Sequence, residues 1–534
     1  MNRMGNRHIV PGLILAAGLA LRLYLLLASR GYVDGDEAMV GLQALEILRG
    51  RHSVFFAGEL LAGSVEAYLV APVFWLFGAS PYTLRIVPLA FSLALILLNY
   101  HLARRAYDEA TGLLSAAMVA VCPLLISVLS LKTWGGYIET ATLGEAALLL
   151  TMAVVSQGSR GSPPYGYLAA TGMLSGVAGW MHPLYFYYLF TVGTALSIYR
   201  FRRSARELCA FVVPFLVGCA PLWLGYLLQQ SGPAASSVAG LVPLKDLGPT
   251  VLAALSYFVT DALPTLVGLR PIKGEMGLSW AWAAVPIYLG GIACGLWKQL
   301  VRGDEARGRD RAVLLLFLLL SPLVFVLGAI TNGNYTVIIP GSGLLSRYAV
   351  PVYTVLPIFA AALIRAARRP APWLPGLLAA VLLGINLWSN VRSDPVAAMR
   401  SPFENVPLPA QNAELVDFLR AEGIRYAYCT HWIGYRLMLD SRLDIQTSDY
   451  IEQSYGMDRL PQFTQAVEAS PEAPAYILFN PHWKKAVPLE ERLRELEVRF
   501  SKAEVLDYVV YYDLSRRVHP AEVRETLIWP YWTS

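Results

Sequence analysis

Charged residues are scarce in this chain. They make up 15% of the 534 residues, whereas hydrophobic residues make up 56% and the mean hydropathy is +0.47. Soluble domains carry roughly a quarter of their residues as charged side chains, so this composition excludes a soluble protein. Long uncharged runs of this kind are membrane spans, and the sequence predicts a polytopic membrane protein. The net charge of +5 collects in short loops, so it bears on topology and not on nucleic-acid binding.

Cysteine and histidine are also few, with five and seven residues. Only Cys429 lies in the polar C-terminal part, while the other four cysteines lie in or beside apolar segments. This distribution excludes a disulfide framework and a metal-ligand spacing. The chain has no visible internal repeat or low-complexity tract. No small-residue cleavage signal follows the first apolar run, residues 9–28, which is therefore predicted to be an uncleaved first helix.

Apolar runs long enough to cross a membrane recur along the first 390 residues. A spanning helix needs about 20 predominantly apolar residues. The sequence predicts eleven such helices, at residues 9–28, 83–103, 113–131, 138–155, 167–181, 184–199, 208–228, 281–297, 312–330, 348–364 and 373–388.

Basic residues decide how two further apolar stretches, 67–78 and 249–268, are interpreted. With eleven helices and a cytoplasmic N-terminus, the inner loops carry 17 lysines and arginines, and the longer outer loops carry 8. This is the positive-inside pattern. Counting either stretch alone as a span would move the following arginine clusters to the outer side. The sequence therefore predicts both as re-entrant or interfacial helices on the outer face.

The composition changes after the last predicted span. Residues 1–390 form the predicted all-α transmembrane domain, with its first outer loop at 29–82, and residues 391–534 form a polar segment on the outer side. This segment alternates between helical and strand-like patterns, which predicts a small α/β domain. The expected elements are helices at 412–421 and 489–497, and strands at 424–429, 475–479 and 505–512.

Three carboxylates, Asp34, Asp36 and Glu37, stand directly after the first apolar run, at the start of the first outer loop. Helix capping accounts for their position, because Asp34 as N-cap and Glu37 three residues later form a capping-box pattern. Asp36 in the first turn suits the helix dipole. Capping is compatible with a catalytic role, and it does not explain why a helix at the membrane edge needs three acids.

The order of motifs around these acids resembles the GT-C membrane glycosyltransferases. An Asp-Glu pair opens an amphipathic helix, a second interfacial helix reads GSVEAYLVAPVFWLFGAS, and the next span begins LRIVPLAFSLALILLNYHLARR. The similar branch contains the protein O-mannosyltransferases, the lipid A aminoarabinose transferases and their bacterial relatives. The resemblance covers the first 180 or so residues and returns at SRYAVPVYTVLPI, residues 346–358, where the family has an Arg-Tyr-x-x-Pro segment.

The resemblance implies an inverting transfer of a sugar from a polyprenyl-phosphate sugar to an acceptor hydroxyl. The acceptor is a glycan, a lipid or a protein, and the reaction takes place on the outer side of the plasma membrane. A single displacement needs a carboxylate as general base and cations on the departing phosphate. Asp36 matches the first-loop acid of the family and is expected to be the base, with Asp34 and Glu37 beside it raising the pKa of one member of the cluster.

Basic side chains at the outer ends of spans are candidates for the donor phosphate. Arg347, followed by Tyr348, matches the arginine of the family and can make a bidentate contact. Lys132, at the outer end of the third predicted span, is a second candidate. The alternative for both cations is an interfacial side chain that snorkels to the membrane surface.

Four further polar residues are expected to bind substrate. Arg22 lies inside the first predicted span, where a charge is by default functional or paired, with outward snorkelling as the alternative. Glu139 follows two glycines that allow a close approach of backbone to a ligand, and Glu66 opens the second interfacial helix. For both acids the alternative is N-terminal capping. His182 precedes Pro183 at a helix end and could donate to phosphate or cap a turn.

No cluster of metal ligands is visible in the sequence, and the one Asp-x-Asp is Asp34-Gly35-Asp36. Such a pair can hold a divalent cation, but a lipid-phosphate donor requires neither a metal nor another cofactor, so metal dependence is left open. Two other classes share long apolar spans. A transporter or lipid flippase is expected to show two related halves, which this chain lacks. A membrane scaffold, or a polymerase or ligase of the O-antigen type, shares an outer loop, and the first-loop acids favour the glycosyltransferase.

Overall fold

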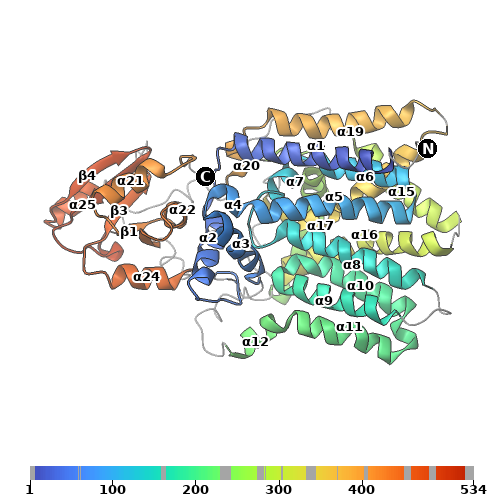
Figure 1. The fold of residues 1–534 in the computed structure, drawn as a ribbon, viewed down its shortest axis with the longest axis horizontal. Helices are drawn as coiled ribbons and strands as arrows, with labels where there is room; N and C mark the ends of the chain where they lie inside the picture. The colour runs from blue at the N-terminus through green and yellow to red at the C-terminus, as the bar shows by residue number, and fades with distance from the viewer. Residues whose placement is uncertain are drawn as a thin grey trace.

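The computed structural model describes residues 6–57, 59, 62–157, 164–228, 242–272, 282, 284–301, 305–331, 344–369, 371–401, 407–449, 459–479 and 489–523. A helical bundle fills one end of the molecule, and a part that contains a small β-sheet fills the other (Figure 1). Helices α2 and α3 of the first predicted outer loop lie between them.

Helices of the first half of the bundle follow each other closely along the chain. They are α1 Asn6–Ala28, α2 Gly35–Leu48, α3 Val65–Phe77, α4 Pro81–Leu84, α5 Ile86–Ala106, α6 Glu109–Ala120, α7 Leu124–Leu129, α8 Tyr137–Ser156, α9 Tyr165–Met181, the short η1 Pro183–Tyr185, α10 Phe186–Tyr199 and η2 Phe201–Arg203.

The second half of the bundle contains shorter and more broken helices. They are α11 Ala205–Gly218, α12 Ala220–Leu228, η4 Leu244–Asp246, α13 Leu247–Tyr257, the π-helix η5 Phe258–Ala262, α14 Leu263–Leu266, α15 Val285–Val301, α16 Glu305–Thr331, η8 Leu344–Ala349, α17 Val350–Tyr353, α18 Leu356–Ala366, α19 Leu374–Arg392 and α20 Pro395–Met399.

Five helical stretches among the described residues are long and apolar enough to cross a membrane: α1, α4 with α5, α8, α16 and α19. Two pairs bent by 56° and 47°, α11 with α12 and the helices from Ser346 to Ala366, raise the number to seven if each is one span. The chain is therefore an integral membrane protein. The predicted spans lie largely in helices, some of them broken, and residues 281 and 283 lie outside the described part. The count of eleven stays a prediction, because α9, α10 and α15 have only 17, 14 and 17 residues.

The third predicted span, 113–131, is broken in the structure. Helix α6 ends at Ala120, α7 begins at Leu124, and Pro123 between them has no N–H to donate. In a bilayer the freed carbonyl groups need protein donors. Side chains of other helices supply them, through the bonds Arg22 Nη1 to Ala120 O at 3.0 Å, Asn386 Nδ2 to Val121 O at 2.8 Å and Asn390 Nδ2 to Cys122 O at 2.8 Å.

Arg22 is therefore bound within the bundle, and its expected role in substrate binding stays a prediction. Its side chain is fully buried, and it donates to Ser92 Oγ at 2.9 Å and to the carbonyl of Gly18 one turn earlier in α1, at 3.0 Å. Snorkelling is wrong for this residue because its guanidinium points into the bundle. The structure gives Arg22 the role of a cap for the interrupted helix α6.

The two stretches predicted as interfacial or re-entrant are helical; the first is short and the second is interrupted. The first is α3, with 13 residues, and the second is α13, η5 and α14, in which the π-helix contains Asp261 and is followed by Pro264. Asp261 pairs with Arg270 at 2.7 Å. Neither stretch passes the length and hydropathy test for a span, as the prediction required.

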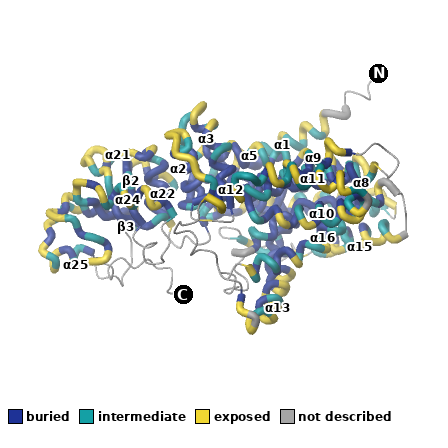
Figure 2. The backbone as a smooth tube through the Cα atoms, turned by 90° about the horizontal axis from the view of Figure 1, so that it is seen from below, coloured by how far each residue is buried: buried dark blue, intermediate teal, exposed yellow. Residues whose placement is uncertain are grey.

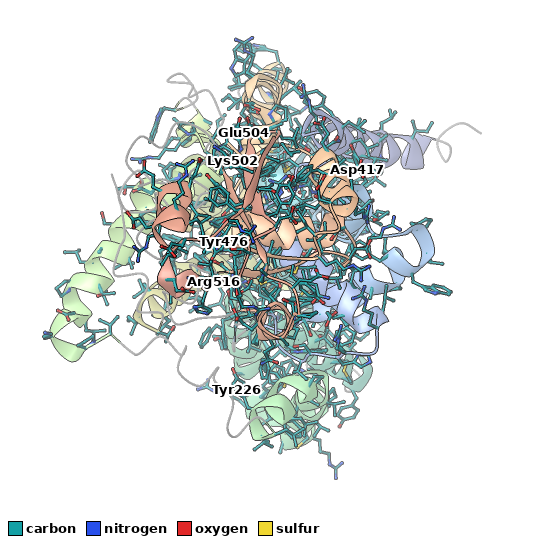
Figure 3. The ribbon with its side chains drawn as sticks, turned by 90° about the vertical axis from the view of Figure 1, so that its left-hand side faces the viewer. Tyr226, Asp417, Tyr476, Lys502, Glu504 and Arg516 are labelled. Atoms are coloured by element: carbon teal, nitrogen blue, oxygen red, sulfur yellow. The ribbon has the colours of Figure 1, made fainter. Side chains whose placement is uncertain are left out.

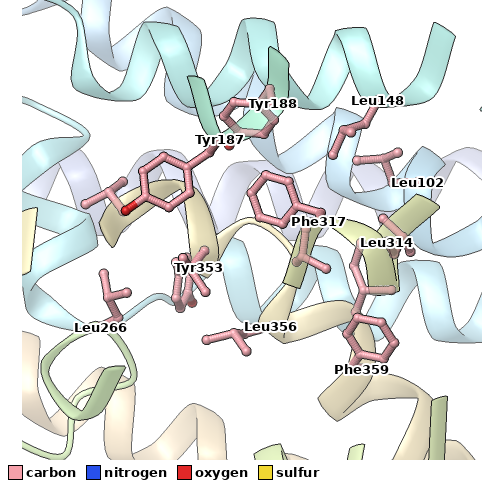
Figure 4. Close-up of a cluster of buried hydrophobic side chains, with 14 of the residues drawn as sticks. Leu102, Leu148, Tyr187, Tyr188, Leu266, Leu314, Phe317, Tyr353, Leu356 and Phe359 are labelled. Atoms are coloured by element: carbon pink, nitrogen blue, oxygen red, sulfur yellow. The ribbon is translucent and has the colours of Figure 1, made fainter. Parts of the chain in front are cut away.

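The centre of the bundle is packed with aromatic and aliphatic side chains (Figure 4). Phe317 of α16 packs against Tyr188 of α10 with ring centroids 5.0 Å apart and ring planes tilted by 36°, and both residues are fully buried. The outside of the bundle is also apolar, since Leu228, Leu300 and Leu319 are 83%, 83% and 74% exposed (Figure 2). Apolar groups on both the inside and the outside are what a helix bundle surrounded by lipid requires.

Arginines from several predicted inner loops meet at one end of the bundle. Arg105, near the end of α5, pairs with Asp310 of α16 at 3.0 Å. Arg309 donates to Val155 O at 3.2 Å at the end of α8. In Figure 1 this end is opposite the end at which α2, α3 and the β-sheet lie. The loops that were assigned to one side of the membrane by charge thus share one end of the molecule.

The C-terminal part contains a five-stranded sheet of order β2-β1-β3-β5-β4, in which β1 is parallel to β2 and β3 while β5 is antiparallel to β3 and β4. Lys502 and Glu504 of β4 and Tyr476 of β3 are labelled in Figure 3, which looks onto this part. Its elements are α21 Ala413–Ala421, β1 Tyr426–Cys429, α22 His431–Asp440, β2 Gln446–Asp449, α24 Pro461–Glu468, β3 Ala475–Phe479, α25 Leu489–Glu495, β4 Ser501–Val505, β5 Tyr508–Tyr512 and η9 Pro520–Glu522.

The predicted elements of this part are present with shifted bounds, and some were missed. The predicted strand 505–512 is the end of a β4–β5 hairpin, with Leu506 in the left-handed region at φ 53° in its turn. Helices α22 and α24 and strand β2 were not predicted. Strand β2, QTSD, carries no apolar alternation from which a strand could be inferred.

Helix α22 attaches the C-terminal part to the first loop. A Cβ added at Gly41 of α2 would lie 2.8 Å from Leu439 of α22, so glycine permits this close packing. The two parts share one buried apolar cluster, which we call the loop core; its members from α2 and α3 include Met39, Val40, Val70 and Phe74, and those from the C-terminal part are Tyr435, Met438, Leu439, Leu443, Leu460 and Phe463. This core holds the C-terminal part against the first loop, close to its three acids.

Candidate active site

Helix α2 begins at the three acids, as the capping pattern predicted. Asp34 is the N-cap, and its carboxylate accepts a hydrogen bond from Glu37 N at 2.9 Å. The Glu37 carboxylate in turn accepts from Asp34 N at 3.4 Å. The capping box is therefore confirmed, and it fixes the direction in which each acid points from the first turn.

Asp34 and Glu37 belong to a fully buried ion network. Lys132 Nζ lies 2.6 Å from Asp34 and 2.9 Å from Glu37, and Arg85 Nη2 lies 2.9 Å from Glu37. All four side chains have 0% exposure, so two cations balance two carboxylates out of contact with water. Trp134 Nε1 donates to Asp34 at 3.0 Å. These contacts connect the start of α2 to Lys132, which follows α7, and to Arg85, which precedes α5. The charge of Lys132 is thus balanced by carboxylates inside the protein.

Arg85 was missed as a member of this network. It stands at the start of the second predicted span, and its guanidinium also donates to the Tyr32 carbonyl. A charge at a span boundary was a signal, because intramembrane and boundary charges are usually paired. The partner could not be identified from the sequence, since Glu37 is 48 residues away.

The pKa values of the two buried acids shift in opposite directions. Burial alone would raise the pKa of Glu37, but Arg85 and Lys132 overcome it and lower the pKa below the usual value. For Asp34, burial raises the pKa more strongly than Lys132 lowers it, and the charges of Glu37 and Asp36 add to the rise. The expected rise in one member of the cluster thus falls on Asp34, with burial as its main cause.

Asp36 is the acid of the three that keeps exposed surface, at 24% of its side chain. Its carboxylate lies 3.3 Å from Nη1 of Arg459, which comes from the C-terminal part. Arg459 also donates to Ala57 O at 3.1 Å, pairs with Glu59 at 3.4 Å and lies over the ring of Phe56. Sequence reasoning did not identify Arg459, because it lies 423 residues from Asp36.

Arg347 lies against aromatic rings close to the acids. Its guanidinium carbon is 5.4 Å from the Trp134 ring centroid and 5.0 Å from that of Tyr348, whose hydroxyl accepts from Nη2 at 3.1 Å. Lys132 Nζ is 4.4 Å from the same Trp134 ring. Trp134 therefore connects Arg347 to the buried network, and the charge of Asp36 also acts on Arg347. The arrangement holds Arg347 at the cluster by cation–π contacts.

His182 lies at the edge of this group, with its ring 4.8 Å from that of Tyr137. Its Nδ1 accepts from Leu184 N at 3.0 Å, which is the turn cap that the sequence offered as the alternative. Burial and the charge of Arg347 lower the pKa of His182 to about 3. The imidazole is therefore neutral at physiological pH, and its protonated form does not supply charge to a phosphate.

Glu66 and Glu139 are brought together behind the aromatic group. Glu66 accepts from Gly135 N at 2.6 Å and is 1% exposed, while Glu139 is fully buried. Glu139 lies in the first turn of α8, where the capping alternative placed it, and neither of its oxygens has a hydrogen-bond partner among the described residues. Burial, with the charge of Glu139, raises the pKa of Glu66 well above its usual value. The left-handed Gly135, at φ 82°, brings its backbone close to Glu66.

Metal ligation was left open by the sequence. Within the described ranges, no group of three or more histidine, cysteine, aspartate or glutamate side chains is arranged to hold a metal ion. The acids of the first loop instead face the cations Lys132, Arg85 and Arg459.

No protein-family model and no curated protein matches this sequence, whereas solved structures match its fold. The crystal structure of ArnT from Cupriavidus metallidurans bound to undecaprenyl phosphate aligns with a TM-score of 0.57 and 14% identity, over 93% of this chain and 97% of that one. The apo state of the same protein gives 0.56 and 14% over the same shares. The archaeal oligosaccharyltransferase AglB from Archaeoglobus fulgidus, in complex with an inhibitory peptide and a dolichol-phosphate, aligns at 0.48 and 11%, over 88% and 69%.

The likeness to ArnT extends over nearly the whole of both chains, and so includes most of the C-terminal part. At 14% identity it establishes the fold and leaves the reaction to be argued from the residues. The resemblance inferred from the first-loop motifs is confirmed at the level of the fold, which this chain shares with ArnT.

Proposed function

We propose that the protein is an inverting glycosyltransferase that moves a sugar from a polyprenyl-phosphate sugar to an acceptor hydroxyl. The observation that carries this proposal is the difference in burial and ion pairing among the three first-loop acids. Asp34 and Glu37 are sealed in ion pairs, whereas Asp36 stays accessible at the same helix start, near Arg347. The fold shared with ArnT, whose structure contains undecaprenyl phosphate, supports the donor class.

Asp36 acts as the general base in this proposal. It accepts the proton of the acceptor hydroxyl while the hydroxyl oxygen forms a bond to the anomeric carbon. The bond from that carbon to the phosphate oxygen breaks, and its electron pair stays on the phosphate. Because attack comes from the face opposite the leaving group, the configuration at the anomeric carbon inverts. A base of this kind contributes roughly 10²- to 10⁴-fold to the rate.

Arg347 stabilises the negative charge that develops on the departing phosphate. A guanidinium can bind two phosphate oxygens at once, and the rings of Trp134 and Tyr348 hold it in place. Tyr348 can add its hydroxyl to the same contact. Lys132 has a supporting role in this proposal, because its ammonium is already bound by Asp34 and Glu37. It holds the start of α2, and thereby Asp36, in position.

The outer side of the plasma membrane is the proposed location of the reaction, with the N-terminus in the cytoplasm. The arginines Arg105 and Arg309 gather at the end of the bundle opposite α2, and basic residues favour the cytoplasmic side. The C-terminal part lies at the same end as α2, so it is also extracytoplasmic. The donor chain would lie in the bilayer, and the acceptor, a glycan, lipid or protein, would approach from the water.

Asp36→Asn in the purified full-length protein tests the proposal directly. With polyprenyl-phosphate sugars as donors, we expect transfer to fall by about 10²-fold or more, because the amide cannot take the proton. Asp417→Asn is the matched control, since it makes the same change at an exposed acid of α21 that is not part of the proposed site. Transfer by Asp36→Asn at the wild-type rate would remove Asp36 from the mechanism.

A further inference from the structure

A cavity of about 380 Å³ lies between the first loop and the C-terminal part, beside the proposed site. Its walls come from α2, from the loop after it and from the start of α24, and they include Gln43, Glu46, His52, Phe55, Arg459 and Gln462. The same Arg459 that lines the cavity also contacts Asp36 at 3.3 Å. The cavity is thus separated from the proposed base by one side chain.

The charges that line the cavity balance. Arg51 pairs with Glu46 at 2.6 Å, and Arg459 pairs with Glu59 at 3.4 Å, which gives two cations and two carboxylates. A phosphate or a metal ion would have to displace one of these partners. A neutral polar ligand can instead hydrogen-bond to the paired groups without disturbing them.

Gln43 lines the cavity with a buried amide. Its side chain is only 7% exposed, and its Nε2 donates to Phe55 O at 3.0 Å, which fixes the direction of the amide. Its Oε1 has no hydrogen-bond partner within the described part of the chain. A buried acceptor without a partner is unfavourable, so a movement of this amide toward a ligand hydroxyl would be favoured.

Aromatic rings complete the lining. Phe55 and Phe56 both border the cavity, and the guanidinium of Arg459 lies 5.6 Å from the Phe56 ring centroid. A ligand that carries both hydroxyl groups and apolar C–H faces matches a wall made of amide, carboxylate and ring. Small-molecule sites are usually partly apolar pockets in which a small number of polar groups point at the ligand.

We infer that this cavity binds a neutral saccharide and serves as the acceptor site. The inference rests on the proposed function, since a saccharide that extends from the cavity past Arg459 would place a hydroxyl group at Asp36. Arg459 is the positioning residue between them, because it contacts the cavity, Asp36 and the Ala57 carbonyl. The acceptor class among glycan, lipid and protein is thereby narrowed to a glycan.

Gln462→Trp in the full-length protein is the test, because Gln462 is exposed and an indole there would fill the cavity. Gln465→Trp is the matched control, three residues later on α24, exposed, and not part of the lining. Saturation-transfer NMR with maltose, lactose and N,N′-diacetylchitobiose measures binding. We expect wild type and Gln465→Trp to bind at least one of these disaccharides, and Gln462→Trp to bind it at least tenfold more weakly.

Three outcomes would overturn the inference: no binding by wild type, binding that Gln462→Trp leaves unchanged, or a hydroxyl-bearing peptide that competes for the cavity where the disaccharides do not bind. Failure of the proposed function is distinguishable. With a polyprenyl-phosphate sugar present, wild type should hydrolyse the donor slowly without acceptor and transfer the sugar to the bound disaccharide. Saccharide binding without any turnover of the donor would reject the glycosyltransferase and retain the saccharide site.

Discussion

Arg459 and Asp36 are 423 residues apart in the sequence, and Arg459 Nη1 lies 3.3 Å from Asp36 Oδ1 in the folded protein. The contact crosses from the C-terminal part to the first turn of α2. It is supported by the loop core, in which Leu460 and Phe463 pack with Val40 and Phe74. The proposed active site is therefore built from both ends of the chain, and the C-terminal part is needed for its geometry.

Arg459→Ala is expected to lower sugar transfer by about tenfold to a hundredfold. The substitution removes the contacts to Asp36, Ala57 and Glu59, and a small misplacement of a catalytic group has an effect of this size. Arg459→Lys keeps the charge but not the planar fork, so it should recover only part of the rate. Rates are measured with saturating donor, and the unfolding temperature serves as control. Full activity of Arg459→Ala would show that the contact has no role in transfer.

Lys132→Met is expected to destabilise the protein strongly, by about 3–5 kcal/mol. It leaves the two buried carboxylates Asp34 and Glu37 with one cation, Arg85, in a site without water. Asp34→Asn removes one of the carboxylates, so the double variant should recover part of the loss. The measurement is a double-mutant cycle of unfolding free energy in detergent. Additive effects of the two substitutions would contradict the coupling, and an unchanged stability of Lys132→Met would contradict the burial of the network.

The sequence was informative where the contacts are local. Asp34 and Glu37 are three residues apart, so their capping box could be predicted from the pattern alone, and the apolar runs predicted the helices. Arg85 and Arg459 meet acids that are 48 and 423 residues away, and no local pattern identifies such partners. The break at Pro123 was missed because hydropathy is continuous across it, although its carbonyl groups require donors from distant helices.

Glu66 is expected to make stability depend on pH. Its pKa is raised in the folded state, chiefly by burial, so the folded protein binds this proton more tightly than the unfolded chain does. The stabilisation is complete below the unfolded pKa of about 4.5 and is lost as pH rises through the raised folded pKa. Glu66→Gln keeps an oxygen for Gly135 N and cannot ionise.

The free energy of unfolding, measured from pH 4 upward, should decline less for Glu66→Gln than for the wild type. Glu59→Gln is the control, because this acid is 53% exposed and should not alter the slope. Parallel curves for Glu66→Gln and the wild type would show that Glu66 is ionised in the folded protein, contrary to the direction of its pKa shift.

Arg22→Met distinguishes the capping role of this residue from substrate binding. The substitution leaves the carbonyl groups of Ala120 and Val119 without their donor, and each unpaired buried group costs about 1–3 kcal/mol. We expect a large loss of stability, partly recovered by Arg22→Lys, and an unchanged KM for the donor in the protein that remains folded. Leu13→Ala on the same helix, 64% exposed, is the control and should change stability little. A raised donor KM at unchanged stability would instead place Arg22 at the substrate.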